Sequence, residues 1–137
     1  IAERVREAVL DEPSKGRRLK QIAGSVEGIS AATLSRAYSE GDELANRLVR
    51  ETGEYLGSGL VGIVNALNPC LLVLGGGVIE GIPDLIAIAE TVIRRHALPP
   101  NIERLRISKA ALGAKAGAVG AAMLARKKFQ NMSRSHK

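Results

Sequence analysis

The sequence predicts an α/β fold in which most residues are helical and about two strands form a sheet too small to stand alone. Over several long segments, apolar residues recur every three or four positions, as along one face of an amphipathic helix. Residues 70–74 are continuously apolar and lead into three glycines, which is typical of a buried, parallel strand that ends in a loop. Such a strand needs neighbours on both sides, and the sequence offers one other candidate strand. We therefore expect the remaining strands to lie upstream, in a longer protein.

Composition indicates one globular domain. The chain has 137 residues, of which 45% are hydrophobic and 25% are charged, a balance typical of folded domains. Its one cysteine, Cys70, excludes a disulfide framework and a Cys-rich zinc site, so we expect a reducing, cytoplasmic environment and a small buried side chain. The first residues alternate charged and apolar side chains, and no apolar run is long enough to span a membrane. These features exclude a secreted miniprotein, a membrane protein and a coiled coil.

The net charge of +6 is concentrated at the C-terminal end. Residues 126–137 carry five basic side chains and no acidic one, whereas the rest of the chain is close to neutral. We therefore divide the chain into a folded part, residues 1–126, and a basic tail, residues 127–137. Nucleic-acid binding would require a basic patch on a folded face. A solvated tail that frays after the last helix is the simpler interpretation, and an arm that contacts phosphate groups is the alternative.

Local signals predict the elements of the N-terminal half. Apolar positions of residues 1–10 share one helical face, and residues 11–28 form a polar connection punctuated by glycines. Ser30 is suited to cap a short helix, and Asp42 is suited to cap the longest helix, residues 43–67. The second half of this long helix is apolar or small nearly all round, so we expect it to be buried on most sides.

Glycines in the long helix predict close packing. Each costs about 1 kcal/mol of helix propensity relative to alanine. Close approach of a neighbouring backbone would offset this cost. The residues concerned are Gly53, Gly57, Gly59 and Gly62.

Downstream of the three glycines the sequence alternates between helices and one more strand. Pro83-Asp84 opens a helix that runs to about Arg95, with Asp84 as its expected cap, and Pro99-Pro100 closes it. Residues 105–108 alternate like a half-exposed strand, and residues 113–126 form a helix of small side chains.

Two glycine motifs are candidates for ligand binding. Residues 57–62 match G-x-G-x-x-G, but a dinucleotide fingerprint requires a preceding strand, and here a charged helix precedes the first glycine. Gly75, Gly76 and Gly77 follow a strand, and open α/β sheets bind ligands at that edge. The alternative is a tight turn that simply needs a positive φ angle.

No side chains are spaced as a catalytic or metal-binding set. The sequence shows no carboxylate pair, Ser/His/Asp set or Cys/His set positioned for chemistry. His96 stands beside Arg94 and Arg95 near the end of a predicted helix, where a cation interacts favourably with the helix dipole. We therefore assign no catalytic residue and no metal ligand to this chain.

Four further motifs occur in a fixed order over about residues 30–126, and their combination is more specific than any one of them. They are Ala37-x-x-x-Gly41-Asp42-x-x-Ala45, Leu56-Gly57-x-Gly59-Leu60-x-x-x-x-Asn65, Asn68-Pro69-x-x-x-Val73-Leu74-Gly75-Gly76-Gly77-Val78, and Leu112-Gly113-x-x-Ala116-Gly117-x-x-Gly120-Ala121-Ala122. In this order they resemble the ROK family of bacterial sugar kinases and sugar-responsive repressors.

The resemblance implies the C-terminal half of an actin-like sugar-kinase domain with RNase H-like topology. The implied activity is that of a glucokinase-like transferase, which moves the γ-phosphoryl group of ATP, bound with Mg²⁺, to a hexose hydroxyl. It assigns Gly75, Gly76 and Gly77 to the motif that approaches the adenosine part of ATP. The family's catalytic aspartate, first phosphate motif, sugar-contacting residues and zinc site would all lie upstream. This chain alone should therefore be inactive.

Two other functions stay open at this stage. In a ROK transcriptional regulator the same half would support sugar-controlled dimerisation, and an upstream helix-turn-helix would bind DNA. Nucleic acid is an expected partner in that case alone. The third reading is a non-catalytic interaction module whose glycine-rich helices dock a partner. For the first two readings the resemblance implies a cytoplasmic homodimer that binds sugar, with no role for a membrane.

Overall fold

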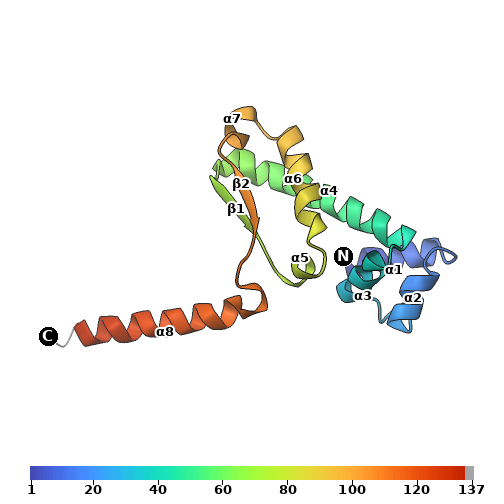
Figure 1. The fold of residues 1–137 in the computed structure, drawn as a ribbon, viewed down its shortest axis with the longest axis horizontal. Helices are drawn as coiled ribbons and strands as arrows, with labels where there is room; N and C mark the ends of the chain where they lie inside the picture. Colours follow the sequence, from blue (N-terminus) through green and yellow to red (C-terminus); the bar gives the residue numbers. More distant parts are fainter. Residues whose placement is uncertain (135–137) are drawn as a thin grey trace.

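The structure is a computed structural model that describes residues 1–134 and shows a mostly helical α/β arrangement (Figure 1). Residues 135–137 of the expected basic tail lie outside the described part. Within that part, no helix combines the length and the hydropathy needed to cross a membrane. In chain order the elements are α1 (Ala2–Asp11), α2 (Arg17–Ala23), α3 (Ala31–Ser39), α4 (Glu43–Leu67), β1 (Leu71–Leu74), α5 (Gly77–Gly81), α6 (Asp84–His96), α7 (Pro99–Ile102), β2 (Arg106–Lys109), the 3₁₀ helix η1 (Gly113–Lys115) and α8 (Ala116–Arg134).

The N-terminal helices enclose one hydrophobic core. Val5 and Val9 of α1 lie in it with Leu34 of α3, as expected from the spacing of apolar residues. The polar connection expected over residues 11–28 contains a helix, α2, that was not predicted. Leu19 of α2 is fully buried in the same core, and this burial stabilises a helix too short to persist on its own.

The helix caps predicted at Ser30 and Asp42 are present, whereas the cap predicted at Asp84 is not. The Ser30 hydroxyl accepts a hydrogen bond from the main-chain N–H of Thr33, whose own hydroxyl accepts one from the N–H of Ser30. Asp42 Oδ1 accepts a 2.8 Å hydrogen bond from the N–H of Ala45 at the start of α4. Capping places the start of α4 at Glu43 and its end at Leu67, as predicted.

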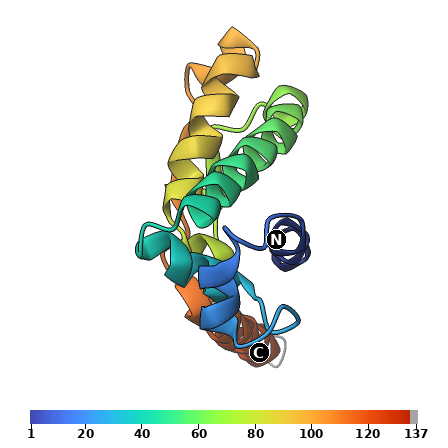
Figure 2. The same cartoon turned by 90° about the vertical axis from the view of Figure 1, so that its right-hand side faces the viewer.

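Helices α4 and α6 pack closely along one another (Figure 2). Gly53 and Gly57 of α4 face Ile88 and Val92 of α6 at distances that leave no room for a side chain, which confirms the predicted role of these two glycines. Gly59 and Gly62, by contrast, have open space around them.

The prediction that the second half of α4 is buried on most sides is wrong for this structure. Its inner face, with Leu60 and Val64, packs in a second hydrophobic core. Its outer face leaves Tyr55, Ile63 and Leu67 exposed. A nearly continuous apolar surface therefore has a partner along one side of the helix only.

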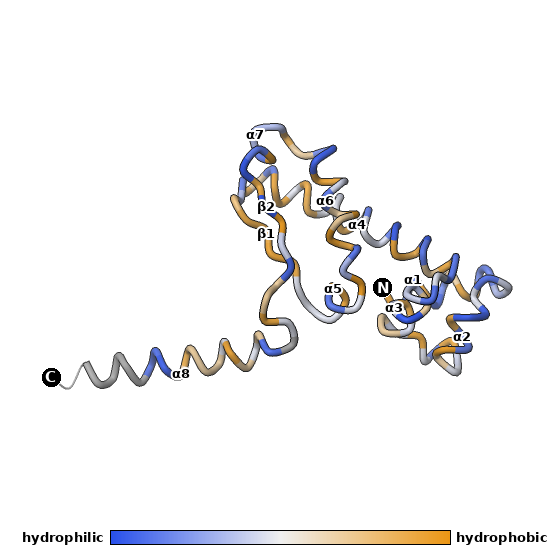
Figure 3. The backbone as a smooth tube through the Cα atoms, in the orientation of Figure 1, coloured by the Kyte–Doolittle hydropathy of each residue, from blue (hydrophilic) through white to orange (hydrophobic). Residues whose placement is uncertain are grey.

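The sheet consists of two parallel strands in the described part of the chain, with Leu71 opposite Arg106 and Leu74 opposite Lys109. This arrangement confirms the parallel strand, but not its burial. Leu71 and Val73 are 48% and 52% exposed, while the alternate side chains, among them Leu72, pack toward the helices. Figure 3 shows this apolar strand alongside the more polar β2. One open face agrees with the expectation that the sheet is incomplete. Cys70, just before β1, is exposed and not buried as expected.

Helix α8 projects from the body of the molecule, and its contacts with other elements are chiefly with η1 (Figure 1). It continues to Arg134. The expectation that the chain frays after residue 126 is therefore wrong as far as the described residues extend. Ala116 to Arg134 contains neither proline nor any glycine after Gly120, so nothing in the sequence stops the helix at residue 126.

Candidate functional site

The triple glycine lies where β1 ends, at the carboxyl edge of the parallel sheet. Gly75 follows Leu74 directly, Gly76 forms the turn, and Gly77 begins α5. Beside them the chain leaves β2, because the N–H of Ala110 donates a 2.8 Å hydrogen bond to the carbonyl of Leu74. Two loops thus leave the same edge of the sheet side by side, which is where open α/β sheets bind ligands.

The three glycines are required for different reasons. Gly76 has a φ of +102°, which side-chain-bearing residues rarely adopt. A Cβ on Gly75 would lie 2.7 Å from the Cβ of Ala110, so a side chain there would push the two loops apart. Gly77 has neither constraint, since its φ is ordinary and nothing lies within 4 Å of the position its Cβ would take. A tight turn therefore explains one glycine and loop packing a second, but neither explains the third.

A cavity of about 590 Å³ opens next to this edge. That volume falls within the range of small-molecule sites. Its charged side chains are Glu80 of α5, Lys109 at the end of β2 and Lys115 of η1. Nζ of Lys109 lies 2.8 Å from Oε2 of Glu80. The surplus of one positive charge suits an anionic ligand.

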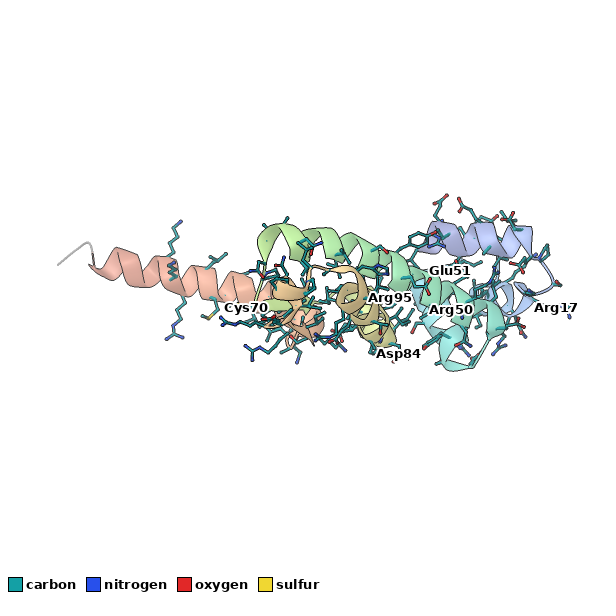
Figure 4. All side chains as sticks on the ribbon, turned by 90° about the horizontal axis from the view of Figure 1, so that it is seen from above. Arg17, Arg50, Glu51, Cys70, Asp84 and Arg95 are labelled. Atoms are coloured by element: carbon teal, nitrogen blue, oxygen red, sulfur yellow. The ribbon has the colours of Figure 1, made fainter. Side chains whose placement is uncertain are left out.

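The remaining residues singled out from the sequence do not form a site. Residues 57–62 lie inside α4, and no strand precedes them in the described part of the chain. Of the glycines in this motif, Gly57 packs against α6, whereas the packing role predicted for Gly59 and Gly62 is wrong because both have open space around them. His96 ends α6, exposed to solvent. It borders a separate groove of about 500 Å³ between α4 and α6, with Arg50 and Arg95 (Figure 4). Among the described residues, no three His, Cys, Asp or Glu side chains gather closely enough to hold a metal ion.

Tyr38 and Asp84 form a polar contact that joins α3 to the start of α6. The Tyr38 hydroxyl donates a 2.6 Å hydrogen bond to Asp84 Oδ2. This bond, with burial and the nearby negative charge, raises the pKa of Tyr38. Asp84 makes no side-chain cap on α6, because Pro83 occupies the capping position.

Glu80 and Lys109 were not identified from the sequence as site residues. Lys109 is the last residue of a short strand. Glu80 follows the triple glycine by three residues, within a five-residue helix that the sequence pattern does not show. The pairing of Leu74 with Lys109 brings them together. The sequence carries no local signal for this contact, because the two residues lie in different segments and meet only through the strand pairing.

The family model for the ROK family matches residues 7–128. The protein belongs to the ROK family.

Among curated relatives, a glucokinase from Halalkalibacterium halodurans is 28% identical over 108 residues, which cover 79% of this chain and 33% of that protein. An N-acetyl-D-glucosamine kinase from Pectobacterium carotovorum is 35% identical over 99 residues, which cover 72% of this chain and 32% of that protein. The chain therefore spans about one third of the length of each of these two relatives.

Two solved structures show the same fold. A ROK family glucokinase from Streptomyces griseus, in complex with glucose and AMPPNP, matches with a TM-score of 0.81 at 29% identity, over 92% of this chain and 41% of that one. A ROK family transcriptional regulator, a homologue of the E. coli MLC protein, matches with a TM-score of 0.54 at 28% identity, over 59% of this chain and 20% of that one. The chain thus corresponds to part of a ROK sugar kinase or regulator.

Proposed function

We propose that this chain is the ATP-binding part of a ROK sugar kinase, which transfers the γ-phosphoryl group of ATP to a hydroxyl of a glucose-type hexose. The observation that carries the proposal is the triple glycine at the carboxyl end of β1, beside a cavity of about 590 Å³. The likeness to a glucokinase in complex with glucose and AMPPNP, at a TM-score of 0.81, supports the same function.

The residues of this edge fit the adenosine part of ATP. Gly77 offers main chain with open space beside it, so a flat ring and its sugar can approach the backbone without meeting a side chain. Lys109 and Lys115 border the cavity and supply positive charge that suits the phosphate groups of a nucleotide. We assign adenosine contact to Gly75, Gly76 and Gly77.

The chemistry of phosphoryl transfer belongs to residues outside this set. Transfer needs an oriented hydroxyl, a base and a metal ion that neutralises charge on the phosphates. No three His, Cys, Asp or Glu side chains of the described residues gather into a metal-binding cluster, and our proposal places neither a metal ligand nor a catalytic residue in this chain. Bound Mg²⁺ would be held by the phosphates of ATP and by residues elsewhere in the protein. Accordingly, we expect this chain alone to bind nucleotide weakly and to be catalytically inactive.

ATP-dependent phosphorylation of a panel of hexoses by the full-length protein tests the proposal. The panel includes glucose and N-acetylglucosamine, and coupled release of ADP reports turnover. Sugar-dependent ADP release is the expected result. A folded protein that binds a sugar but releases no ADP would contradict kinase activity.

Substitution of the glycines tests the assignment of the nucleotide site. Gly76→Val places two methyl groups at the adenosine approach, and we expect ATP to bind at least about tenfold more weakly, a loss of about 1.4 kcal/mol. Valine at Gly76 would also strain the backbone, because φ there is +102°. Gly77→Val avoids this second effect, since Gly77 has an ordinary φ and open space around its Cβ position. It should weaken ATP binding to a similar extent while sugar affinity and melting temperature stay unchanged. Unchanged ATP affinity in Gly77→Val would contradict the assignment.

A regulator is the second candidate function, and the match to a ROK transcriptional regulator favours it. In that case the full-length protein would bind operator DNA through residues outside this chain, and sugar would change its affinity. Anisotropy of labelled DNA, with and without sugar, distinguishes the two functions. For either function we propose a cytoplasmic homodimer, which light scattering coupled to gel filtration would detect.

A further inference from the structure

Glu80 joins the two loops that leave the carboxyl edge of the sheet. It lies on α5, three residues after Gly77, and its carboxylate Oε2 is 2.8 Å from Nζ of Lys109. Lys109 is the last residue of β2 and pairs in register with Leu74, the last residue of β1. One ion pair thus links the segment after the triple glycine to the end of the neighbouring strand.

A third segment meets the same carboxylate. Gly113, where η1 begins, has a φ of +50°, and a Cβ on it would lie 3.6 Å from Oε1 and from the carboxyl carbon of Glu80. The carboxylate of Glu80 therefore occupies the space in front of the Gly113 main chain. Residues 110–113 and 115 form one wall of the cavity, and Glu80 closes it on the side of α5.

The two carboxylate oxygens of Glu80 differ in their surroundings. Oε2 contacts Lys109, whereas Oε1 is buried and has no hydrogen-bond partner among the described residues. A buried acceptor without a hydrogen bond lowers the free energy of unfolding, so Oε1 does not contribute to the stability of the fold. The side chains of Glu80 and Lys109 are 34% and 40% exposed, and an ion pair of that exposure adds little to the free energy of unfolding.

The placement of α5 depends on such tertiary contacts. A helix of five residues is too short to be stable by its own hydrogen bonds. The Ser35 hydroxyl of α3 donates a 2.6 Å hydrogen bond to the carbonyl of Gly81 at the far end of α5. Glu80 supplies the contact on the side of the sheet. Because α5 begins at Gly77, its position sets the position of the triple glycine.

We propose that Glu80 is a positioning residue for nucleotide binding: through Lys109 it fixes α5, and with it the turn at Gly76 and Gly77, relative to residues 110–115, which border the cavity. This role rests on the proposed function, because it takes the ligand at this edge to be ATP. Glu80 acts through the loops that it joins, and neither it nor the ion pair is a catalytic group.

A double-mutant cycle in the full-length protein tests the role. The variants are Glu80→Gln, Lys109→Met, the double variant, and the charge-reversed pair Glu80→Lys with Lys109→Glu. ATP affinity is measured by calorimetry, with the KM for sugar and the melting temperature recorded for each. We expect each single variant to bind ATP about fivefold more weakly, which corresponds to the upper range for an ion pair of this exposure. The double variant should lose no more than either single one, and the reversed pair should recover part of the loss.

A matched control lies on α6. Arg94 and Glu90 form an ion pair of comparable exposure away from the cavity, so Glu90→Gln should leave ATP affinity unchanged. A parallel loss of ATP affinity, sugar affinity and melting temperature in Glu80→Gln would show a merely structural role and overturn the proposal. Unchanged ATP affinity in Glu80→Gln and Lys109→Met, in an experiment where Gly77→Val does weaken ATP binding, would also overturn the proposal. If the wild-type full-length protein binds no ATP, the proposed function fails first.

Discussion

Replacement of Gly57 by alanine tests the helix packing that supports the candidate site. Gly57 is buried in α4, and a Cβ on it would lie 2.6 Å from Cβ of Val92 and 2.9 Å from the carbonyl oxygen of Ala89. These atoms cannot rotate away, because one is a Cβ and the other is main chain. Helices α4 and α6 would therefore have to separate along the contact seen in Figure 2.

The expected change in the free energy of unfolding follows from two opposing effects. Overpacking of this kind costs about 1–3 kcal/mol, and contact with main-chain atoms places Gly57→Ala at the upper end. The higher helix propensity of alanine offsets about 1 kcal/mol of this destabilisation. The net destabilisation is therefore about 2 kcal/mol. Gly59, on the same helix, has no atom within 4 Å of its Cβ position. Gly59→Ala should thus stabilise the protein by about 1 kcal/mol.

Urea denaturation of the full-length protein, followed by circular dichroism, measures both variants against the wild type. We expect the midpoint to fall for Gly57→Ala and to rise for Gly59→Ala, with the two free energies about 3 kcal/mol apart. Equal midpoints for the two variants, or a rise in both, would refute the close approach of α4 and α6 at Gly57.

Other predictions concern the pH dependence of stability and the C-terminal segment. Tyr38→Phe removes the hydrogen bond to Asp84 and should lower the free energy of unfolding by about 1 kcal/mol at neutral pH. That bond raises the pKa of Tyr38, so the stabilisation it provides is present below the ordinary pKa of about 10 and is lost as the pH rises through the raised pKa. The urea midpoints of Tyr38→Phe and the wild type should therefore converge at alkaline pH. The hydrogen bond to Lys15 is the main cause that lowers the pKa of Glu12. The stabilisation that this contact provides is present above the ordinary pKa of 4.5 and is lost as the pH falls through the lowered pKa. An NMR titration of the Glu12 carboxyl group should therefore show a midpoint below 4.5. Deletion of residues 127–137 should leave the ATP affinity of the full-length protein nearly unchanged, and a large loss in calorimetry would show that this segment contacts the nucleotide.

The helix boundaries that could be predicted are those with a local chemical signal. Asp42 marks the start of α4 through a hydrogen bond to a residue three positions away, and Asn68-Pro69 marks its end. A contact between residues so close in the chain can be predicted from the sequence alone. Helices α2 and α5 were not predicted. Both are shorter than two full helical turns, so apolar residues cannot recur often enough in them to show a helical pattern.

Half of the candidate site could be predicted in the same way. Three glycines after an apolar run indicate a strand followed by main chain that is free of side chains, and Gly75 to Gly77 lie as expected at the end of β1. Glu80 and Lys109 are 29 positions apart in the sequence, and only the register of β1 against β2 and the placement of α5 bring them together. No local pattern carries information about that register.

Burial shows the same division. Leu71, Val73 and Leu67 are hydrophobic, so their transfer from water to an apolar environment is favourable. Hydrophobicity alone does not show whether another surface lies close enough to bury them. In the structure all three are exposed, while Leu72 and Leu60 on the opposite faces are covered by neighbouring elements. The amino-acid sequence thus sets which segments are helical or extended, where capped helices begin, and where glycine is needed. Tertiary structure decides which apolar faces are covered and which charged side chains meet, because both depend on contacts between residues far apart in the chain.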